Sequence, residues 1–317
     1  MKAIWLSLNA SFNYASSESL PGSLVKTDVA ATALFVAAVR ARENERSNPL
    51  FKDQLSSLLA GREGLAWLAA SEANPGSNYH RDSFPYLEVR TRYFDDWVLK
   101  AVRECEARQL VLLGAGMDTR AFRLPWPEGF QFWEIDTPEL FALKEARLQS
   151  AGVRLDCDRL VVEADLTSGD WVDSLVGRGF KKNLPTVWLA EGLFQYLKGT
   201  DVGQILESAA SVSSPAGRLG AETISAEFLR RMSNQERLRR RKDRGTPWVF
   251  GTDDPEKLFR SHGWKVEDKV GALTAAVTLG RWPATNLEMS RSQVGPPGAF
   301  FVSATKAPLA RAAGDKK

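Results

Sequence analysis

The chain has 317 residues, 44% of them hydrophobic, which is enough to bury a full core as one large domain or two small ones. Its 42 basic and 39 acidic residues leave a formal charge of +3, so we expect neither nucleic acid nor a membrane surface as a partner. Cys105 and Cys157 are isolated, and His80 and His262 lie far apart, so the sequence offers neither a disulfide framework nor a metal site.

The sequence contains no segment that would take it into a membrane. No run of about 18 apolar residues occurs, and the apolar segment at the N-terminus is broken by Asn9. Isolated cysteines are typical of a reducing compartment. We therefore expect a cytoplasmic protein.

Helical patterns fill the first hundred residues. Apolar residues recur at helical spacing over 25–43, and similar patterns cover 49–61 and 83–104. A loop containing proline and glycine is predicted at 74–77. Residues 1–105 are therefore expected to form a helical N-terminal region.

From residue 108 onward, short apolar segments alternate with helical or turn segments. Uninterrupted apolar runs are typical of strands covered on both faces, and the alternation predicts a parallel, doubly wound sheet. The predicted strands are 109–115, 130–136, 159–166, 186–193, 218–225, 264–269 and 299–306. The last two have no clear helix between them and are expected to pair antiparallel at one edge.

An arginine-rich helical insertion is predicted near 226–250, between the fifth and sixth strands. Its arginines, at 230–244, could contact nucleic acid or an anionic substrate, but the acids among them favour a helix face exposed to water. The core is expected to extend over 106–307, and 308–317 is expected to be a disordered tail.

A glycine pair follows the first predicted strand. Gly114 and Gly116 lie where the backbone of an open α/β sheet comes closest to a ligand, although the same glycines could serve a tight turn alone. Asp136 ends the second strand twenty residues after Gly116, the offset at which an acid binds ribose hydroxyls. Asp136 also suits the start of a helix at Thr137. We predict a ribose-bearing cofactor.

Thr119 stands where the pattern G-x-G-x-x-G has its third glycine. That glycine permits close helix packing around a pyrophosphate, so the threonine disfavours NAD. An NAD-dependent oxidoreductase stays open as an alternative of another class. A non-catalytic module that binds the cofactor without turnover is a second alternative.

These segments resemble a known family. LGAGMDTRAFRL (113–124), the E-I-D strand end and WLAEGLFQYL (188–197) are similar to the leucine carboxyl methyltransferase and polyketide O-methyltransferase family of S-adenosylmethionine-dependent enzymes. The resemblance extends to TALFVAAVRARE, RTRYFDD and GTDDPEKLFRSHGW, and so covers most of the chain. It implies a class I methyltransferase fold, which is a Rossmann-like, seven-stranded, doubly wound α/β sheet with an N-terminal helical lid and a helical insertion. The cofactor that it implies is S-adenosyl-L-methionine.

Carried over residue by residue, the resemblance implies a cofactor site at the carboxyl ends of the strands. The expected residues are Gly114, Ala115 and Gly116 for the methionine part, Asp136 for the ribose, Asp165 and Leu166 for the adenine, and Glu191 for the methionine amino group.

The family also places cations at the methionine carboxylate, where charge-assisted hydrogen bonds hold it. Lys26 and Arg90 correspond to these cations, and Arg92, two residues further on, is an alternative to Arg90. Purely structural roles stay open for each residue. Asp165 could cap a helix, Glu191 could close a turn, and the cations could face water.

The acceptor decides whether a catalytic base is needed. Methyl transfer from a sulfonium is an in-line displacement that depends on positioning and exclusion of water. A carboxylate acceptor, with a pKa of about 4, is already ionised, whereas a phenol near 10 benefits from a base. Tyr196 and His80 are the candidates to touch the acceptor, and both could equally be structural.

We predict O-methylation of a hydroxyl or carboxyl group of a small natural product, with a polyketide-derived acceptor as the nearest analogy. The protein-modifying branch of the family carries an arginine directly after the Asp-Leu pair, and Thr167 stands there in this chain. Carboxyl methylation of a protein C-terminus is therefore the alternative. The expected partner is a small-molecule acceptor.

Overall fold

The computed structural model describes residues 28–74, 79, 83–149, 151–153, 155–243, 245–283 and 298–308. Two predicted site residues, Lys26 and His80, lie outside the described residues, as does the predicted tail after Pro308. The division of the chain at residue 105 stays a prediction.

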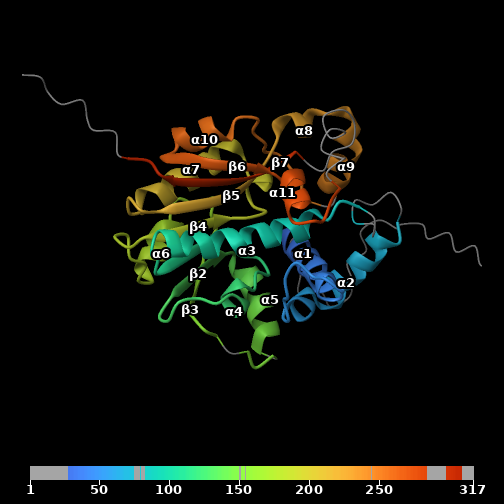
Figure 1. Ribbon diagram of the computed structural model, residues 1–317, viewed down its shortest axis with the longest axis horizontal. Helices are drawn as coiled ribbons and strands as arrows, with labels where there is room; N and C mark the ends of the chain where they lie inside the picture. The colour runs from blue at the N-terminus through green and yellow to red at the C-terminus, as the bar shows by residue number, and fades with distance from the viewer. Residues whose placement is uncertain are drawn as a thin grey trace, which may run out of the picture.

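Within the described residues, seven strands form one sheet in the order β3-β2-β1-β4-β5-β7-β6 (Figure 1). The strands are β1 (Gln109–Leu113), β2 (Gln131–Asp136), β3 (Asp158–Glu163), β4 (Thr186–Ala190), β5 (Arg218–Ile224), β6 (Trp264–Gly271) and β7 (Ala299–Lys306). Each falls on a predicted strand. Strands β1 to β5 are parallel, and β7 is antiparallel to both β5 and β6. The predicted antiparallel pair is confirmed, with β6 as the edge and β7 inside.

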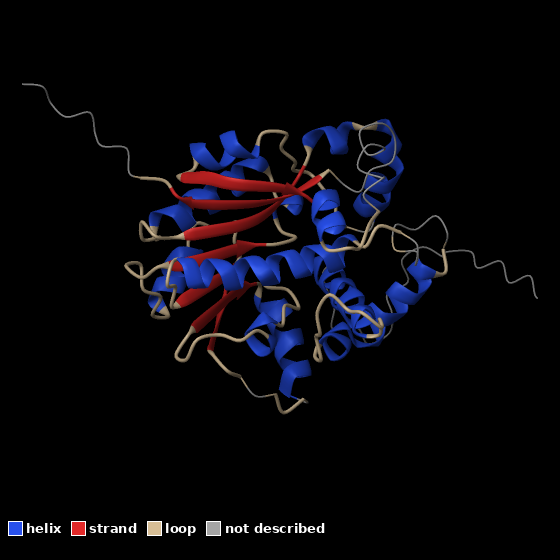
Figure 2. Ribbon diagram, in the orientation of Figure 1, coloured by secondary structure: helices blue, strands red, loops and turns tan. Residues whose placement is uncertain are grey.

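Helices cover both faces of the sheet, as Figure 2 shows. Because side chains alternate along a strand, Leu110 and Leu112 of β1 face one buried cluster and Val111 and Leu113 face the other. The first cluster includes residues of α3 (Tyr86–Glu104), α5 (Pro138–Gln149) and α11 (Ala272–Thr278). The second includes residues of α6 (Trp171–Gly177), α7 (Gly199–Ser211) and α10 (Pro255–Ser261). The sheet is doubly wound, as predicted.

Helix α11 corrects the expectation that no helix separates the last two strands. Ala272, Ala275 and Ala276 are buried, and the helix packs on α3. At seven residues, it is too short to show a helical period in the sequence.

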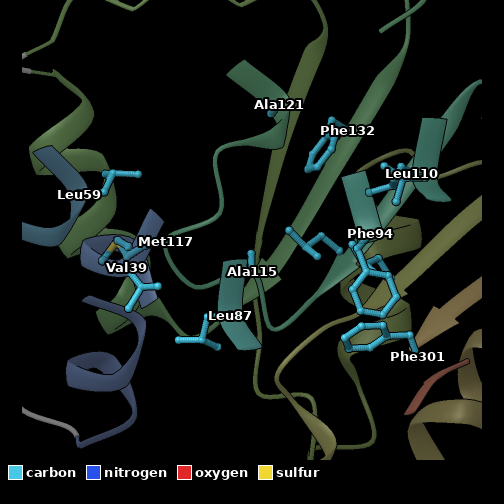
Figure 3. Close-up of a cluster of buried hydrophobic side chains, with 14 of the residues drawn as sticks. Val39, Leu59, Leu87, Phe94, Leu110, Ala115, Met117, Ala121, Phe132 and Phe301 are labelled. Atoms are coloured by element: carbon cyan, nitrogen blue, oxygen red, sulfur yellow. The ribbon is translucent and has the colours of Figure 1, made fainter. Parts of the chain in front are cut away.

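The N-terminal helices α1 (Asp28–Asn44) and α2 (Ser56–Glu72) pack against each other at one end of the sheet. Figure 3 shows Val39 of α1, Leu59 of α2 and Leu87 of α3 in the same buried cluster as Phe94 and Phe301. The lid predicted from the resemblance is therefore joined to the core by apolar packing.

Helix α2 begins at Ser56, so the helical prediction for residues 49–55 is wrong. Side chains at the end of α1 bind this segment instead. The Leu50 amide donates to Glu43 Oε1 at 2.7 Å, and the Asp53 amide donates to Asn44 Oδ1 at 2.8 Å. These hydrogen bonds compete with helix formation in a way that apolar spacing does not reveal.

The remaining helices lie after β1 and between β5 and β6. They are α4 (Arg120–Arg123), α8 (Ala226–Arg230) and α9 (Met232–Asp243). In Figure 1, α8 and α9 lie at the same end of the molecule as α1 and α2.

We expect Gly220→Ala to lower the free energy of unfolding by about 1–3 kcal/mol, because the added Cβ would overlap the Trp97 ring where α3 crosses β5. Gly177→Ala in α6 is the control, since its Cβ meets no atom within 4 Å. The control should be neutral or slightly stabilising. Urea denaturation of both variants checks this, and equal effects would contradict the packing of Trp97 on Gly220.

Candidate functional site

The turn after β1 contains the predicted glycines. Gly114 and Gly116 have φ values of 69° and 50°, the region that favours glycine. The amides of Gly114 and Ala115 both donate to the Ile135 carbonyl at 3.0 Å, which ties the turn to β2. A Cβ on Gly114 would lie 3.0 Å from Leu193 Cδ1, so the turn also packs against the segment after β4.

Asp136 ends β2 with its carboxylate bound to this turn. Oδ2 accepts the Gly116 amide at 2.8 Å and Oδ1 accepts the Thr137 amide at 2.7 Å. Burial raises the pKa of Asp136, and these two hydrogen bonds oppose the rise. Helix α5 begins at Pro138, so the helix-start alternative holds as well. A carboxylate oxygen accepts more than one hydrogen bond, so each oxygen of Asp136 can still accept one from a hydroxyl group such as that of a ribose.

Arg90 joins α3 to the ends of β4 and β5. Its Nε donates to Glu191 Oε1 at 2.8 Å, and its Nη1 donates to Glu222 Oε2 at 2.9 Å. Glu222 also accepts the Gly192 amide at 2.7 Å and the Tyr86 hydroxyl. Arg90 and Glu222 are both buried. One guanidinium therefore bridges two strand ends.

The two carboxylates on Arg90 differ in pKa. Burial opposes ionisation of Glu191, but the guanidinium groups of Arg120 and Arg90 outweigh it and lower the pKa. At Glu222 burial dominates and raises the pKa to about 8, against the Gly192 amide and the charge of Arg241. Glu191 is therefore charged at neutral pH, whereas Glu222 titrates near it.

Arg120, in the motif M-D-T-R, is fully buried. Its guanidinium nitrogens lie 2.8 Å from Asp95 Oδ1, 2.5 Å from Asp118 Oδ2 and 2.7 Å from Glu191 Oε2. Burial alone would lower the pKa of Arg120, but the Asp118, Glu191 and Asp95 carboxylates raise it overall. Arg120 thus links α3, the turn after β1 and the end of β4 around one charge.

Further polar contacts extend this network to the N-terminal helices. Arg40 of α1 donates to Asp53 at 2.8 Å, and the Thr119 hydroxyl donates to the same carboxylate at 2.7 Å. Arg123 donates to both oxygens of Asp95, at 2.6 and 2.8 Å. Thr119 is buried, so a side chain fills the place where a dinucleotide turn has glycine.

Arg90 and Arg92 have different surroundings. Arg92 is 40% exposed, pairs with Asp96 at 2.8 Å and donates to the Leu50 carbonyl at 2.6 Å. The structure therefore brings Arg90, but not Arg92, to Glu191.

The segment after β3 contains the predicted adenine residues. Asp165 accepts the amide and the hydroxyl of Thr167, both at 2.8 Å. It does not cap α6, whose N-cap is Asp170. Leu166 is buried in the core under α6 and α7.

Tyr196 ends a single 3₁₀ turn, η1 (Phe194–Tyr196), after β4. Burial raises the pKa of Tyr79, and the pKa also responds to the side chains of Arg241, Tyr196 and Arg90. The Arg241 guanidinium opposes this rise in the Tyr79 pKa. Arg241, Tyr196 and Arg90 therefore all lie near enough to Tyr79 for their charges to act on its phenol.

Arg241 is an exception to the predicted solvated arginine face. Arg230 and Arg231 are exposed and pair with Asp253 and Glu227, each at 2.8 Å. Arg241 is partly buried, with Cζ 4.1 Å from the centroid of the Trp248 ring. The pattern of charges in the sequence does not show that Arg241 contacts the Trp248 ring.

Sequence reasoning missed four functional candidates, Glu222, Arg120, Tyr79 and Arg241. Glu222 is an acid within an apolar strand. A buried acid needs a charged or hydrogen-bonding partner, so its position in the sequence could have marked it as a candidate. Arg120 stood in the quoted motif without a role. Tyr79 and Arg241 lie in a loop and in a charged helix, where spacing indicates nothing.

The described residues contain no group of three or more His, Cys, Asp and Glu side chains that could hold a metal ion. No helix in the same part of the chain is long and apolar enough to cross a membrane.

Similar folds occur in solved structures. A DUF574 family protein from Streptomyces avermitilis has a TM-score of 0.54 at 14% identity, covering 86% of this chain and 97% of that one. A structure from Thermobifida fusca, titled as a methyltransferase, has a TM-score of 0.51 at 14% identity, covering 87% and 94%. The fold is that of the class I methyltransferases.

Sequence comparisons show the family. Residues 33–210, more than half of the chain, match the leucine carboxyl methyltransferase family. A Saccharopolyspora erythraea protein named for S-adenosyl-L-methionine-dependent methyl transfer is 36% identical over 259 residues, 79% of this chain and 88% of that protein. A Mycolicibacterium smegmatis protein of the same name is 33% identical over 290 residues, 84% and 90% of the two chains. The chain is an S-adenosylmethionine-dependent methyltransferase. It belongs to the leucine carboxyl methyltransferase family.

We expect Arg120→Gln to lower the free energy of unfolding by about 3–5 kcal/mol, because three buried carboxylates lose a shared counter-charge. Arg92→Gln removes an exposed pair and should cost less than about 1 kcal/mol. Urea denaturation at neutral pH measures both. Coinciding midpoints would show that the buried network carries no stability.

The pKa values of Glu222 and Glu191 predict a difference in pH dependence. The pKa of Glu222 is higher in the folded protein than in the unfolded chain, so the folded protein binds its proton more tightly. This contribution to stability is fully present below about pH 4.5 and is lost as the pH rises towards about 8. Glu222→Gln should therefore flatten a decline of at least ~1 kcal/mol between about pH 5 and pH 8.

Glu191→Gln is the matched control for this experiment. The lowered pKa of Glu191 gives stability that is lost only as the pH falls below about 4.5, so its difference from wild type should stay constant over the same range. Chemical denaturation at about pH 5, 6.5 and 8 makes the comparison. Parallel curves for wild type and Glu222→Gln would rule out the raised pKa.

Proposed function

We propose that this methyltransferase transfers its methyl group to an oxygen atom, a hydroxyl or carboxyl, of a small natural product such as a polyketide-derived compound. The observation that carries the proposal is that the segments of Arg241 and Tyr196 lie together. The Val249 amide donates to the Gln195 carbonyl at 2.8 Å, and the Arg241 guanidinium lies over the neighbouring Trp248 ring. We call the region around Tyr79, Tyr196 and Arg241 the acceptor end. Guanidinium and phenol groups stabilise an oxygen that holds negative charge. A protonated amine acceptor would need a free base, and both Glu191 and Glu222 are bound by Arg90.

The residues at the strand ends fit S-adenosylmethionine. The positive φ values of Gly114 and Gly116 give a turn without side chains after β1, where a ligand would approach the main chain closely. Asp136 lies at the end of the neighbouring strand, where it would accept the ribose hydroxyls. The buried Thr119 side chain supports a cofactor without a pyrophosphate.

The charged ends of the methionine part find matching partners in our proposal. Glu191 would face its ammonium group, and Arg90 would face its carboxylate together with Lys26. Asp165 and Leu166 would flank the adenine. When bound, the cofactor supplies a methyl group made electrophilic by the adjacent sulfonium.

The chain's own contribution to the reaction is alignment. Tyr196 would hydrogen-bond the acceptor oxygen and hold it in line with the methyl group, and no covalent enzyme intermediate is required. Helix α3 packs on β4 and β5 and contacts α1. We propose that these two helices limit the access of water to the site.

Methylation of a protein C-terminus is the second candidate. In this family resemblance, an arginine after the Asp-Leu pair marks the protein-modifying branch. Thr167 takes that place and binds back to Asp165, so it offers no cation for a peptide carboxylate. This contact favours the small-molecule acceptor.

Asp136→Asn should weaken S-adenosylhomocysteine binding about tenfold or more, because it replaces a carboxylate acceptor of ribose hydroxyls with an amide. Asp170→Asn, exposed at the start of α6, should bind like wild type. Isothermal titration calorimetry measures both variants. Equal affinities would remove Asp136 from the cofactor site.

Tyr196→Phe should lower kcat about tenfold while the dissociation constant of S-adenosylhomocysteine changes less than about twofold, because the lost hydroxyl acts on the acceptor alone. Transfer of labelled methyl to a panel of phenols and aryl carboxylic acids gives the turnover. Tyr93→Phe in α3, whose ring packs on Phe94 and Phe301, is the control. Loss of both properties, or of neither, would exclude Tyr196 from the acceptor end.

A further inference from the structure

Arg241 is held in a fixed position by its own helix and the segment that follows. Its guanidinium lies over the Trp248 ring, with Cζ 4.1 Å from the ring centroid. Its carbonyl accepts the Thr246 amide at 3.0 Å, which folds the chain after α9 back onto the helix. A stacked guanidinium is more ordered than an arginine side chain in water, so Arg241 is pre-organised for binding.

This guanidinium faces the candidate active site. Its positive charge acts on the pKa values of both Tyr79 and Glu222. Tyr196 and Arg90 act on the same phenol. The Val249 amide donates to the Gln195 carbonyl at 2.8 Å, so the segment that follows Arg241 lies against the turn of Tyr196, at the acceptor end.

Arg241 differs from the other arginines of the site in its partners. Arg90 pairs with two carboxylates and Arg120 with three. Within the part of the chain that the structure describes, no carboxylate forms an ion pair with Arg241. Beside it, the buried Trp248 Nε1 finds no hydrogen-bond partner among the described residues. Both groups are donors, so the missing partner is an acceptor.

We propose that Arg241 binds a carboxylate of the methyl acceptor, and that this carboxylate is separate from the oxygen that is methylated. The inference rests on the proposed O-methyl transfer and narrows its substrate class to acceptors that also carry an acid. A guanidinium that pairs with no carboxylate of the described residues matches one negative charge, and its planar fork matches carboxylate geometry. Arg241 is then a residue that determines specificity.

The carboxylate is assigned as an anchor for a chemical reason. A charge-assisted hydrogen bond stabilises the negative charge on the bound oxygen and so makes it a weaker nucleophile. An oxygen beside Tyr196 carries no such ion pair and is better suited to attack the methyl group. The acceptor would thus span from Tyr196 to Arg241.

The test uses the full chain loaded with S-adenosylhomocysteine. Dissociation constants are measured by ligand-observed NMR for benzoate, phenylacetate and 4-hydroxybenzoate and for the primary amide of each acid. We expect at least one acid to bind the wild type about tenfold more tightly than its amide. Arg241→Gln should abolish this preference, and Arg241→Lys should keep part of it.

Lys242→Gln is the matched control, because it removes the same charge from an exposed neighbouring position in α9. It should keep the preference for the acid, and every variant should bind S-adenosylhomocysteine like wild type. Equal affinities for acid and amide, no binding by any pair, or an unchanged preference in Arg241→Gln would overturn the inference.

Two further outcomes would also overturn it. If Arg241→Gln loses affinity for S-adenosylhomocysteine, Arg241 belongs to the cofactor site. If labelled S-adenosylmethionine converts benzoate to its methyl ester, the carboxylate is the methylated group. Failure of the wild type to bind S-adenosylhomocysteine would instead overturn the proposed cofactor site, which distinguishes the two failures.

Discussion

A guanidinium buried under the ends of a sheet needs carboxylates around it, because an uncompensated internal charge costs several kcal/mol. Arg120 meets this requirement with Asp95, Asp118 and Glu191. The three acids belong to α3, to the turn after β1 and to the end of β4. Satisfying one charge therefore fixes the relative positions of three segments that are distant in the sequence.

The rest of the site depends on this arrangement. Glu191 is shared between Arg120 and Arg90, so the position of Arg90 on α3 follows from it. Arg90 in turn reaches Glu222 at the end of β5. A cofactor bound here would meet groups already held in place by ion pairs, which lowers the entropy lost on binding.

Much of the fold could be predicted from the sequence, because buried parallel strands are continuous apolar runs and every predicted strand was found. The position of Asp136 beside Gly116 was also predictable, because one crossover connects the end of β1 to β2 and fixes their separation in the sequence. The short helix α11 and the non-helical segment 49–55 before α2 were not predictable. They depend on tertiary packing and on side-chain hydrogen bonds from Glu43 and Asn44.

The charged residues of the site show more clearly what the sequence alone does not predict. Arg90 and Arg92 are two residues apart on one helix, and the sequence alone does not say which of them faces the core. Arg241 stands among other arginines, and only its contact with Trp248 distinguishes it. Partners of this kind are set by the fold and leave no periodic pattern in the chain.

The central claim is that the ends of β1, β2 and β4 form the S-adenosylmethionine site. The most direct test is a crystal structure of the protein with S-adenosylhomocysteine. We expect the ribose hydroxyls within hydrogen-bond distance of Asp136 and the ammonium group beside Glu191, with the contacts of Arg120 retained. A nucleoside bound elsewhere, or a ribose turned away from Asp136, would contradict this account.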